Sequence, residues 1–269
     1  IPVGHVEAGL RTFDKYSPFP EEMNRKLIGQ IAELHFAPTP RNSENLKREN
    51  ICDGVYICGN TVVDAIHMTV KQDYQFKDEN LNKLDFENNR VVLVTAHRRE
   101  NYGEPMENIY NAILELANKY TDVHFVYPVH LSPYVRETSE KILGGHERIH
   151  LIAPLSVDEM HNLMSRCYMI MTDSGGLQEE APSLGKPVLV LRKETERPEA
   201  VEAGTVKLAG VNKENIYKLA CELFDDKTAY EKMAHAVNPY GDGHACERIL
   251  QAIEHHFKLR QDAPQAFMP

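Results

Sequence analysis

The hydrophobic residues of this 269-residue chain recur in short runs separated by polar turns. Uninterrupted apolar runs such as 91–94 and 188–191 are typical of strands buried on both faces of a sheet. Apolar residues at helical spacing, as at 104–119, instead predict amphipathic helices. These patterns predict strands at 1–6, 35–37, 55–58, 91–95, 123–129, 149–152, 168–171, 187–191 and 206–208. They predict helices at 21–32, 40–49, 61–68, 104–119, 132–142, 157–165 and 244–258.

Strands and helices alternate along most of the chain, which predicts an α/β fold with a parallel sheet covered on both faces. Residues 71–90 are charged and poor in aliphatic side chains, so we expect a linker and a surface helix there. Residues 1–60 amount to roughly half of a doubly wound domain of about 100–150 residues, and we expect the other half upstream. The predicted domains are therefore 1–70, the C-terminal half of an N-terminal Rossmann-like domain; 71–243, a nucleotide-binding Rossmann-like domain; and 244–269, a C-terminal helix and tail.

A glycine turn follows the strand predicted at 168–171, in the sequence T-D-S-G-G-L-Q-E-E-A. Ser174, Gly175 and Gly176 would present backbone N–H groups at a helix N-terminus, where partial positive charge favours a phosphate. Glu179 and Glu180 follow in the first helical turns, where a carboxylate can accept hydrogen bonds from a ribose diol. The alternative is an ordinary tight turn that uses glycine for a positive φ, followed by ordinary N-terminal charge.

Two loops near the start of the chain carry carboxylates. Glu7 lies just past the strand predicted at 1–6, where ligands bind in open α/β sheets. Glu21 begins a helix after the turn made by Pro18 and Pro20. Two carboxylates held by rigid turns suit general acid–base chemistry. The alternative is that Glu21 and Glu22 merely complement the helix dipole.

A third loop, T-A-H-R-R-E-N, directly follows the strand predicted at 91–95. We expect His97, Arg98 and Arg99 to act as a clamp on a diphosphate, because arginine pairs well with phosphate oxygens. The alternative is a solvated histidine beside arginines in ordinary salt bridges.

Composition limits the possible functions. A formal net charge of −10 provides no basic field that would recruit nucleic acid, and an anion must be held locally. The apolar runs are too short to span a bilayer. The five cysteines form no C-x-x-C pair and suggest a reducing, cytoplasmic setting. Residues 146–150 match H-E-x-x-H, but the second histidine lies in a predicted strand rather than on a helix, so we expect no metal site.

Taken together, these segments resemble the non-hydrolysing UDP-N-acetylglucosamine 2-epimerase family. The resemblance rests on stretches that span nearly the whole chain in family order: HVEAGLRT, SPFPEEMNR, HFAPT, GNTVVDA, TAHRREN, YPVHLSP, HLIAPL, TDSGGLQEEAPSLGKPVLVLR, ETERPEAVEAGT and NPYGDGHACERI. It implies a GT-B-like fold, with two Rossmann-like domains and a ligand cleft between them. It also implies a cytoplasmic homodimer that uses no cofactor, and UDP-N-acetylglucosamine and UDP as ligands.

The resemblance also implies roles for single residues. Those matched to catalysis are Glu7, Glu21 and His97. Those matched to UDP and substrate binding are Arg98, Arg99, Ser174, Gly175, Gly176 and Glu180, with Glu180 on the ribose. Arg98 and His130 match residues that bind a second, regulatory UDP-N-acetylglucosamine in bacterial members. Family members carry an N-terminal Arg and a catalytic Asp ahead of the segment with which this sequence begins, so we expect an incomplete N-terminal domain here.

The implied reaction is reversible epimerisation at C2, by anti elimination of UDP to 2-acetamidoglucal and re-addition of UDP. One alternative is a hydrolysing relative that releases N-acetylmannosamine and UDP. Another is a non-catalytic module that binds UDP-sugars. A GT-B glycosyltransferase is disfavoured, because Glu7 and Glu21 would have no evident role in it.

Overall fold

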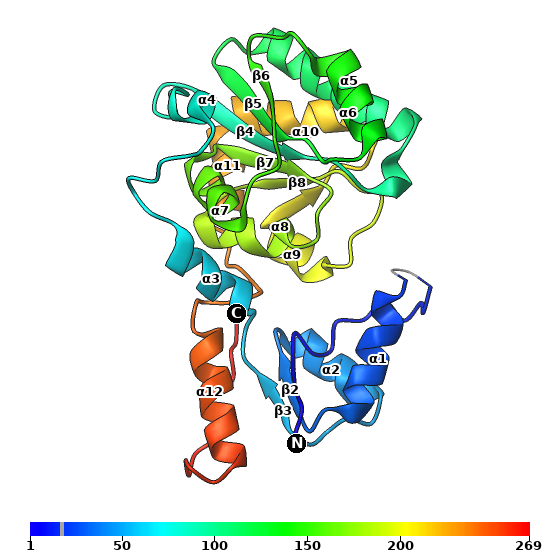
Figure 1. The fold of residues 1–269 in the computed structure, drawn as a ribbon, viewed down its shortest axis with the longest axis vertical. Coiled ribbons are helices and arrows are strands. Elements are labelled where there is room, and N and C mark those ends of the chain that lie inside the picture. The colour runs from blue at the N-terminus through cyan, green and yellow to red at the C-terminus, as the bar shows by residue number, and fades with distance from the viewer. Residues whose placement is uncertain (17–18) are drawn as a thin grey trace. The chain divides into compact units, whose positions relative to one another are not determined.

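The computed structural model describes residues 1–16 and 19–269, and its contacts divide the chain into two compact units. The first unit comprises Ile1–Met68 together with Asn238–Pro269, and the second comprises Thr69–Val237. Each unit contains its own parallel sheet (Figure 1). The domain limits expected from the sequence, at 70 and 243, stay predictions.

The second unit is built on a six-stranded sheet in which every pair of neighbouring strands is parallel. The strand order is β6-β5-β4-β7-β8-β9. The strands are β4 (Arg90–Thr95), β5 (Val123–Pro128), β6 (Ile149–Ile152), β7 (Met169–Thr172), β8 (Val188–Val190) and β9 (Val206–Leu208). The strands and the parallel sheet predicted from the sequence are thereby confirmed.

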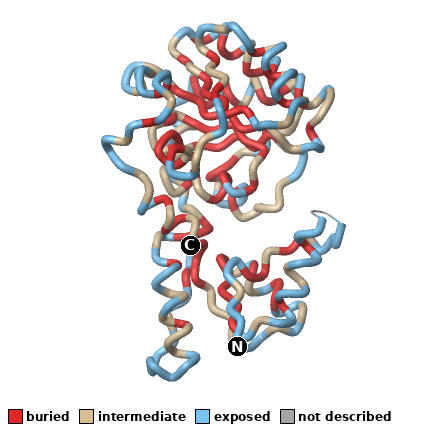
Figure 2. The backbone as a smooth tube through the Cα atoms, viewed as in Figure 1, coloured by how far each residue is buried: buried red, intermediate tan, exposed pale blue. Residues whose placement is uncertain are grey.

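Helices bury both faces of this sheet. Val92 and Val94 belong to a core cluster with residues of α5 (Glu104–Lys119) and α10 (Lys213–Asp225). Val91 and Leu93, which alternate with them and point to the opposite face, are fully buried as well. Figure 2 shows that buried backbone is concentrated in these strands. The remaining helices are α6 (Pro133–Leu143), α7 (Val157–Arg166), α8 (Leu177–Glu180), α9 (Pro198–Ala203) and α11 (Lys227–Ala234), with short 3₁₀ turns at Arg99–Asn101 and Ala181–Leu184.

The segment at 71–90 is less exposed than its charge suggests. It contains the expected surface helix, but α4 covers only Glu79–Asn82. Phe76 and Leu81 are buried, and the Lys77 N–H donates to Glu159 of α7 at 3.1 Å. The segment is therefore held against α7 rather than extended as a solvated linker.

The first unit contains a three-stranded parallel sheet in the order β1-β2-β3. Its strands are β1 (Gly4–Val6), β2 (Leu34–Ala37) and β3 (Val55–Ile57). Its helices are α1 (Glu21–Ile31), α2 (Pro40–Arg48), α3 (Thr61–Thr69) and α12 (Ala245–His256), all predicted from the sequence.

Within the first unit, the N-terminus of the C-terminal helix α12 is bonded to α3. Asp64 of α3 accepts hydrogen bonds from the Ala245 N–H at 3.1 Å and the Cys246 N–H at 2.8 Å. A carboxylate at this end of a helix satisfies unpaired amides and complements the helix dipole. The chain beyond α12 returns to the sheet, where the Phe267 N–H donates to the Ile57 carbonyl at 2.8 Å. Among the described residues, no helix combines the length and the apolar character that crossing a membrane requires.

Candidate functional site

The carboxyl ends of two neighbouring strands form the base of the candidate site. β4 and β7 are parallel, and Thr95 lies opposite Thr172, with their hydroxyl oxygens 2.5 Å apart. Because the strands end together, the loops beginning at Ala96 and Asp173 leave the sheet side by side. The Tyr127 hydroxyl donates to the Ala96 carbonyl and thereby holds the first residue of one loop.

Asp173 organises the loop that follows β4. Its carboxylate is fully buried, and Oδ2 accepts hydrogen bonds from the main-chain N–H groups of His97 at 2.7 Å and Arg98 at 2.8 Å. The Asn101 side chain donates to the same oxygen at 3.3 Å. Sequence reasoning missed Asp173, although its place between a buried strand and a glycine pair was a usable signal.

The His97 ring lies between Asp173 and His130. Its Nδ1 is 3.4 Å from Asp173 Oδ1, and its face stacks on His130 with ring centroids 5.2 Å apart. His130 is exposed, and its Nδ1 accepts a hydrogen bond from the Ser132 N–H at 3.0 Å. The structure therefore brings together a histidine expected to act in catalysis and one expected to bind a regulatory ligand.

A pocket of about 460 Å³ opens beside these loops, within the size range of small-molecule sites. Its lining combines apolar side chains with a few polar ones: Thr95, His97, Pro128, His130, Leu131, Pro154, Leu155, Val157, Met160, His161, Ser174, Leu177 and Glu180. Four residues singled out from the sequence are thus gathered on one pocket: His97, His130, Ser174 and Glu180.

The glycine pair at 175–176 serves a purpose other than a left-handed turn. Neither glycine has a positive φ, and Gly176 is helical at φ −60° and ψ −46°. A Cβ on Gly175 would lie 3.2 Å from the Arg197 guanidinium carbon, and a Cβ on Gly176 would lie 3.3 Å from Glu180 Oε1. The alternative that the turn needs glycine for its φ is therefore wrong: the glycines leave room for close neighbours.

The two adjacent glutamates of this turn have different surroundings. Glu179 is buried and accepts a hydrogen bond from Arg197 Nε at 2.7 Å, whereas Glu180 lines the pocket. Glu180 Oε2 lies 3.6 Å from Nε2 of the buried His161, whose Nδ1 is 2.7 Å from the Thr69 hydroxyl. Of the two carboxylates, only Glu180 is placed to meet a ligand in this pocket.

The two arginines of the T-A-H-R-R-E-N loop do not line the pocket. Arg98 Nε donates to the Asp173 carbonyl at 3.2 Å, and Arg99 is exposed at the first position of the 3₁₀ turn. Their expected action as a diphosphate clamp stays a prediction.

The carboxylates of the first unit are divided between exposed and buried positions. Glu7 directly follows β1 with a φ of +59°, and Glu21 is the first residue of α1; both are exposed. Glu22 is fully buried and accepts hydrogen bonds from the N–H groups of Thr12 at 3.1 Å and Phe13 at 3.0 Å. The alternative that Glu22 merely complements the helix dipole is therefore incomplete, because its carboxylate also holds the loop that follows Glu7. Of the turn expected ahead of α1, Pro18 lies outside the described residues.

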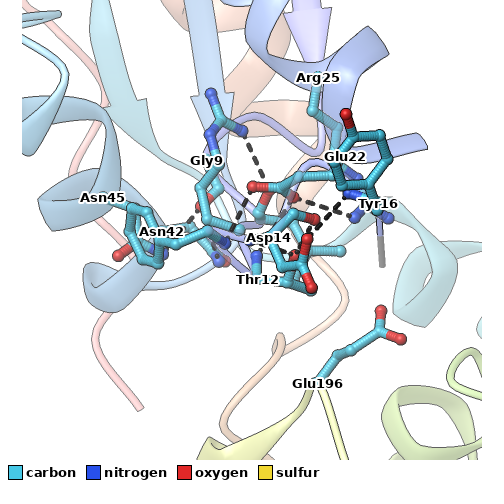
Figure 3. Close-up of polar contacts among 12 residues, drawn as sticks. Gly9, Thr12, Asp14, Tyr16, Glu22, Arg25, Asn42, Asn45 and Glu196 are labelled. Carbon is cyan, nitrogen blue, oxygen red and sulfur yellow. Dashed lines mark hydrogen bonds and ion pairs between the residues drawn. The ribbon is translucent and has the colours of Figure 1, made fainter. Parts of the chain in front are cut away.

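The same loop is held on its other side by α2. Gly9 has a φ of +88°, and its carbonyl accepts a hydrogen bond from the Asn45 side chain at 3.0 Å (Figure 3). The buried Arg11 donates to both carboxylate oxygens of Glu49, at 2.9 and 2.8 Å. The stretch that carries Glu7 is thus fixed by several polar contacts.

The H-E-x-x-H match does not lie on a helix, because residues 146–148 form a turn that leads into β6. His150 lies in β6, and its ring stacks on His124 with Nε2 3.0 Å from His124 Nδ1. His146 lies before the strand, with Nε2 3.3 Å from Asn118 Oδ1. Within 1–16 and 19–269, no group of three or more His, Cys, Asp or Glu side chains could hold a metal ion.

Comparison with known proteins agrees with this geometry. The family model described as UDP-N-acetylglucosamine 2-epimerase matches residues 1–254. The UDP-N-acetylglucosamine 2-epimerase of Bacillus subtilis is 53% identical over 268 residues, covering 99% of this chain and 70% of that protein.

Solved structures extend the likeness to the fold. S. aureus MnaA in its UDP co-structure is 52% identical, with a TM-score of 0.94 over 100% of this chain and 73% of that one. The Neisseria meningitidis UDP-GlcNAc 2-epimerase bound to UDP-GlcNAc is 48% identical, with a TM-score of 0.85 over 94% of this chain and 70% of that one. The α/β, GT-B-like fold class expected from the sequence is confirmed. The chain belongs to the UDP-N-acetylglucosamine 2-epimerase family.

Proposed function

We propose that this protein interconverts UDP-N-acetylglucosamine and UDP-N-acetylmannosamine by reversible epimerisation at C2. The proposal rests on one observation: the loop that carries His97 and the turn that carries Ser174 follow neighbouring strands and line the same pocket. The related proteins of known structure that were solved with UDP and with UDP-GlcNAc support a nucleotide sugar as its ligand.

In this proposal the pocket of the second unit holds UDP. The Ser174 hydroxyl and the amides of Gly175 and Gly176 bind the diphosphate, because amides ahead of a helix have no partner within that helix. Glu180, on the pocket wall, accepts the ribose hydroxyls. The apolar side chains of Leu131 and Leu155 leave a surface suited to the uracil ring.

The chemistry of the sugar explains why acid and base groups are needed. The C2 proton of N-acetylglucosamine is not next to a carbonyl carbon, so direct deprotonation is unfavourable. Departure of UDP from C1 gives the ring oxocarbenium character and makes the C2 proton more acidic. Anti elimination then yields 2-acetamidoglucal and UDP, and re-addition with the opposite configuration at C2 completes the epimerisation without a hydride carrier. Glu7 and Glu21 are the candidate acid and base, and His97 is a candidate for proton transfer.

The resemblance also assigns a regulatory ligand and a dimer to this protein. We propose that Arg98 and His130 contact a second UDP-N-acetylglucosamine. The stacking of His130 on His97 supports this, since a ligand that contacts His130 would lie next to the ring that packs on His97. The homodimer stays a prediction.

The decisive test is proton NMR of the protein with UDP-N-acetylglucosamine in D₂O. Deuterium at C2, with UDP-N-acetylmannosamine accumulating, is the expected result. Free N-acetylmannosamine plus UDP would indicate the hydrolysing reaction instead. Binding of UDP without any exchange at C2 would indicate a non-catalytic module that binds UDP-sugars.

Two variants connect this test to the site. We expect Glu7→Gln to abolish deuterium exchange at C2 while UDP still binds, since the Glu7 side chain is exposed and Gln has nearly the same size. Ser174→Trp should block UDP binding, because an indole at that position would fill part of the pocket. Unchanged UDP affinity in Ser174→Trp, measured by calorimetry, would refute the nucleotide site.

A further inference from the structure

One oxygen of the Asp173 carboxylate is buried without a hydrogen bond. Oδ2 accepts the hydrogen bonds that hold the loop after β4, while Oδ1 has no hydrogen-bond partner among residues 1–16 and 19–269. Burial of an unpaired carboxylate oxygen is costly, and such a group calls for an explanation. The group that Oδ1 faces is His97, whose Nδ1 lies 3.4 Å away, slightly beyond hydrogen-bond length.

Two neighbours lie against the partly exposed His97 ring. Its main-chain N–H is bonded to the same carboxylate, and its face stacks on His130 with an interplanar angle of 11°. With Nδ1 on the Asp173 side, Nε2 is the ring nitrogen left for a ligand in the pocket that His97 lines.

We infer that Asp173 is a positioning residue that acts through His97. With a ligand bound, its Oδ1 accepts a hydrogen bond from His97 Nδ1–H, so that Nε2 carries the lone pair. Contacts of this kind are often long in unliganded sites and tighten in the complex. When Nε2 takes up a proton, the ring becomes an imidazolium whose charge the ionised carboxylate stabilises. When Nε2 returns that proton, the same Nδ1–H tautomer is restored, as in hydrolases with a Ser-His-Asp arrangement.

The role of Nε2 in turnover depends on the proposed epimerase function, whereas the tautomer of His97 does not. The variant Asp173→Asn separates the two. The amide oxygen of Asn can still accept the N–H groups of His97 and Arg98, which preserves the loop. Its NH₂ group then faces His97 Nδ1 and donates to it, which forces the ring into the Nε2–H tautomer.

The first measurement is ¹⁵N NMR of the histidine side chains with UDP bound. We expect His97 to be the Nδ1–H tautomer in the wild-type protein and the Nε2–H tautomer in Asp173→Asn. The second is turnover, which should fall by about 100-fold or more in Asp173→Asn, since a misplaced acid–base group costs that much. The Kd for UDP should stay within about threefold, because the loop keeps its hydrogen bonds.

A double-mutant comparison supplies the control. If Asp173 acts through His97, Asp173→Asn should reduce turnover further by less than about threefold in a His97→Gln background, because residues that act as a unit are not additive. An equal loss in both backgrounds would overturn the inference, as would an unchanged tautomer in Asp173→Asn. If Asp173→Asn does not fold, the ¹⁵N NMR measurement of the wild-type protein is sufficient as a test. An Nε2–H tautomer of His97 with UDP bound would then overturn the inference. Absence of wild-type exchange at C2 would count against the proposed function, and the tautomer would still test the inference.

Discussion

Two neighbouring glutamates at the start of α1 should respond very differently to the same substitution. Glu21 and Glu22 both lie in the first turn of the helix, where each complements the helix dipole. Glu21 is exposed, whereas the Glu22 carboxylate is fully buried against the loop at 12–13. We therefore predict that Glu22→Gln destabilises the first unit and that Glu21→Gln, its matched control, does not.

The size of the difference follows from the hydrogen bonds. The Glu22 carboxylate accepts the Thr12 and Phe13 N–H groups at 3.1 and 3.0 Å, and each such bond to a charged group contributes about 1.5–3 kcal/mol. Gln retains one oxygen and turns its NH₂ group toward the other donor, so one of the two part-buried main-chain N–H groups loses this acceptor. Arg25, 3.8 Å away, also loses its charged partner. We expect a loss of about 3 kcal/mol for Glu22→Gln and under about 1 kcal/mol for Glu21→Gln, which loses only the dipole interaction.

Hydrogen exchange of single amides measures this difference within the first unit, without requiring the whole chain to unfold in one step. The amides of Thr12 and Phe13 should lose protection in Glu22→Gln. Amides of β2 should also exchange faster, by a factor that corresponds to the loss in the free energy of unfolding of the first unit. Glu21→Gln should leave the Thr12 and Phe13 amides protected and should lower the protection of the β2 amides by under about 1 kcal/mol, while it abolishes deuterium exchange at C2 of the substrate. Equal protection in the two variants would refute the buried role of Glu22 and restore the dipole interpretation for both residues.

Three other perturbations test the fold around the site. Gly9→Ala should destabilise the first unit by about 3 kcal/mol or more in urea unfolding, because φ is +88° and a Cβ would lie 2.1 Å from the Asn42 carbonyl oxygen; a neutral result would refute that geometry. Asp64→Ala should expose the amides at the start of α12 to faster hydrogen exchange, with a loss of about 1–2 kcal/mol. Burial, followed by a neighbouring histidine and two arginines, lowers the pKa of His5 to about 4. The unfolded chain therefore takes up a proton between pH 6.5 and 4 that the folded chain does not, and stability should fall as pH drops through that window. His5→Gln should flatten this dependence in urea unfolding at pH 7 and 4.5, whereas the exposed control His235→Gln should not.

Much of the fold could be predicted because buried parallel strands have a simple pattern. The apolar runs 91–94 and 188–190, which lie within β4 and β8, have no polar position, as is typical of strands buried on both faces of a sheet. Three helices between 198 and 234 were not predicted, although Ile216, Ala220 and Leu223 of α10 repeat at helical spacing and are fully buried. The helical spacing of α10 was therefore a usable signal in the sequence.

The candidate site was predictable to the extent that its residues follow strands. His97, Ser174 and Glu180 were identified in that way, and the structure gathers them on one pocket. Asp173 and His161 were missed because their importance depends on the neighbours that other elements supply. A sequence places Asp173 next to Ser174, but it does not state that β4 is the strand beside β7.

That pairing of strands determines which atoms can work together. A parallel register slip of one residue between β4 and β7 would turn the Thr95 and Thr172 side chains to different faces and separate Asp173 from the amides of the loop it holds. The hydroxyl contact between Thr95 and Thr172 and the buried Asp173 carboxylate both depend on the observed register. The polar residues at the carboxyl ends of β4 and β7 therefore have two roles. They fix the alignment of these two central strands, and they leave one carboxylate oxygen of Asp173 directed at His97.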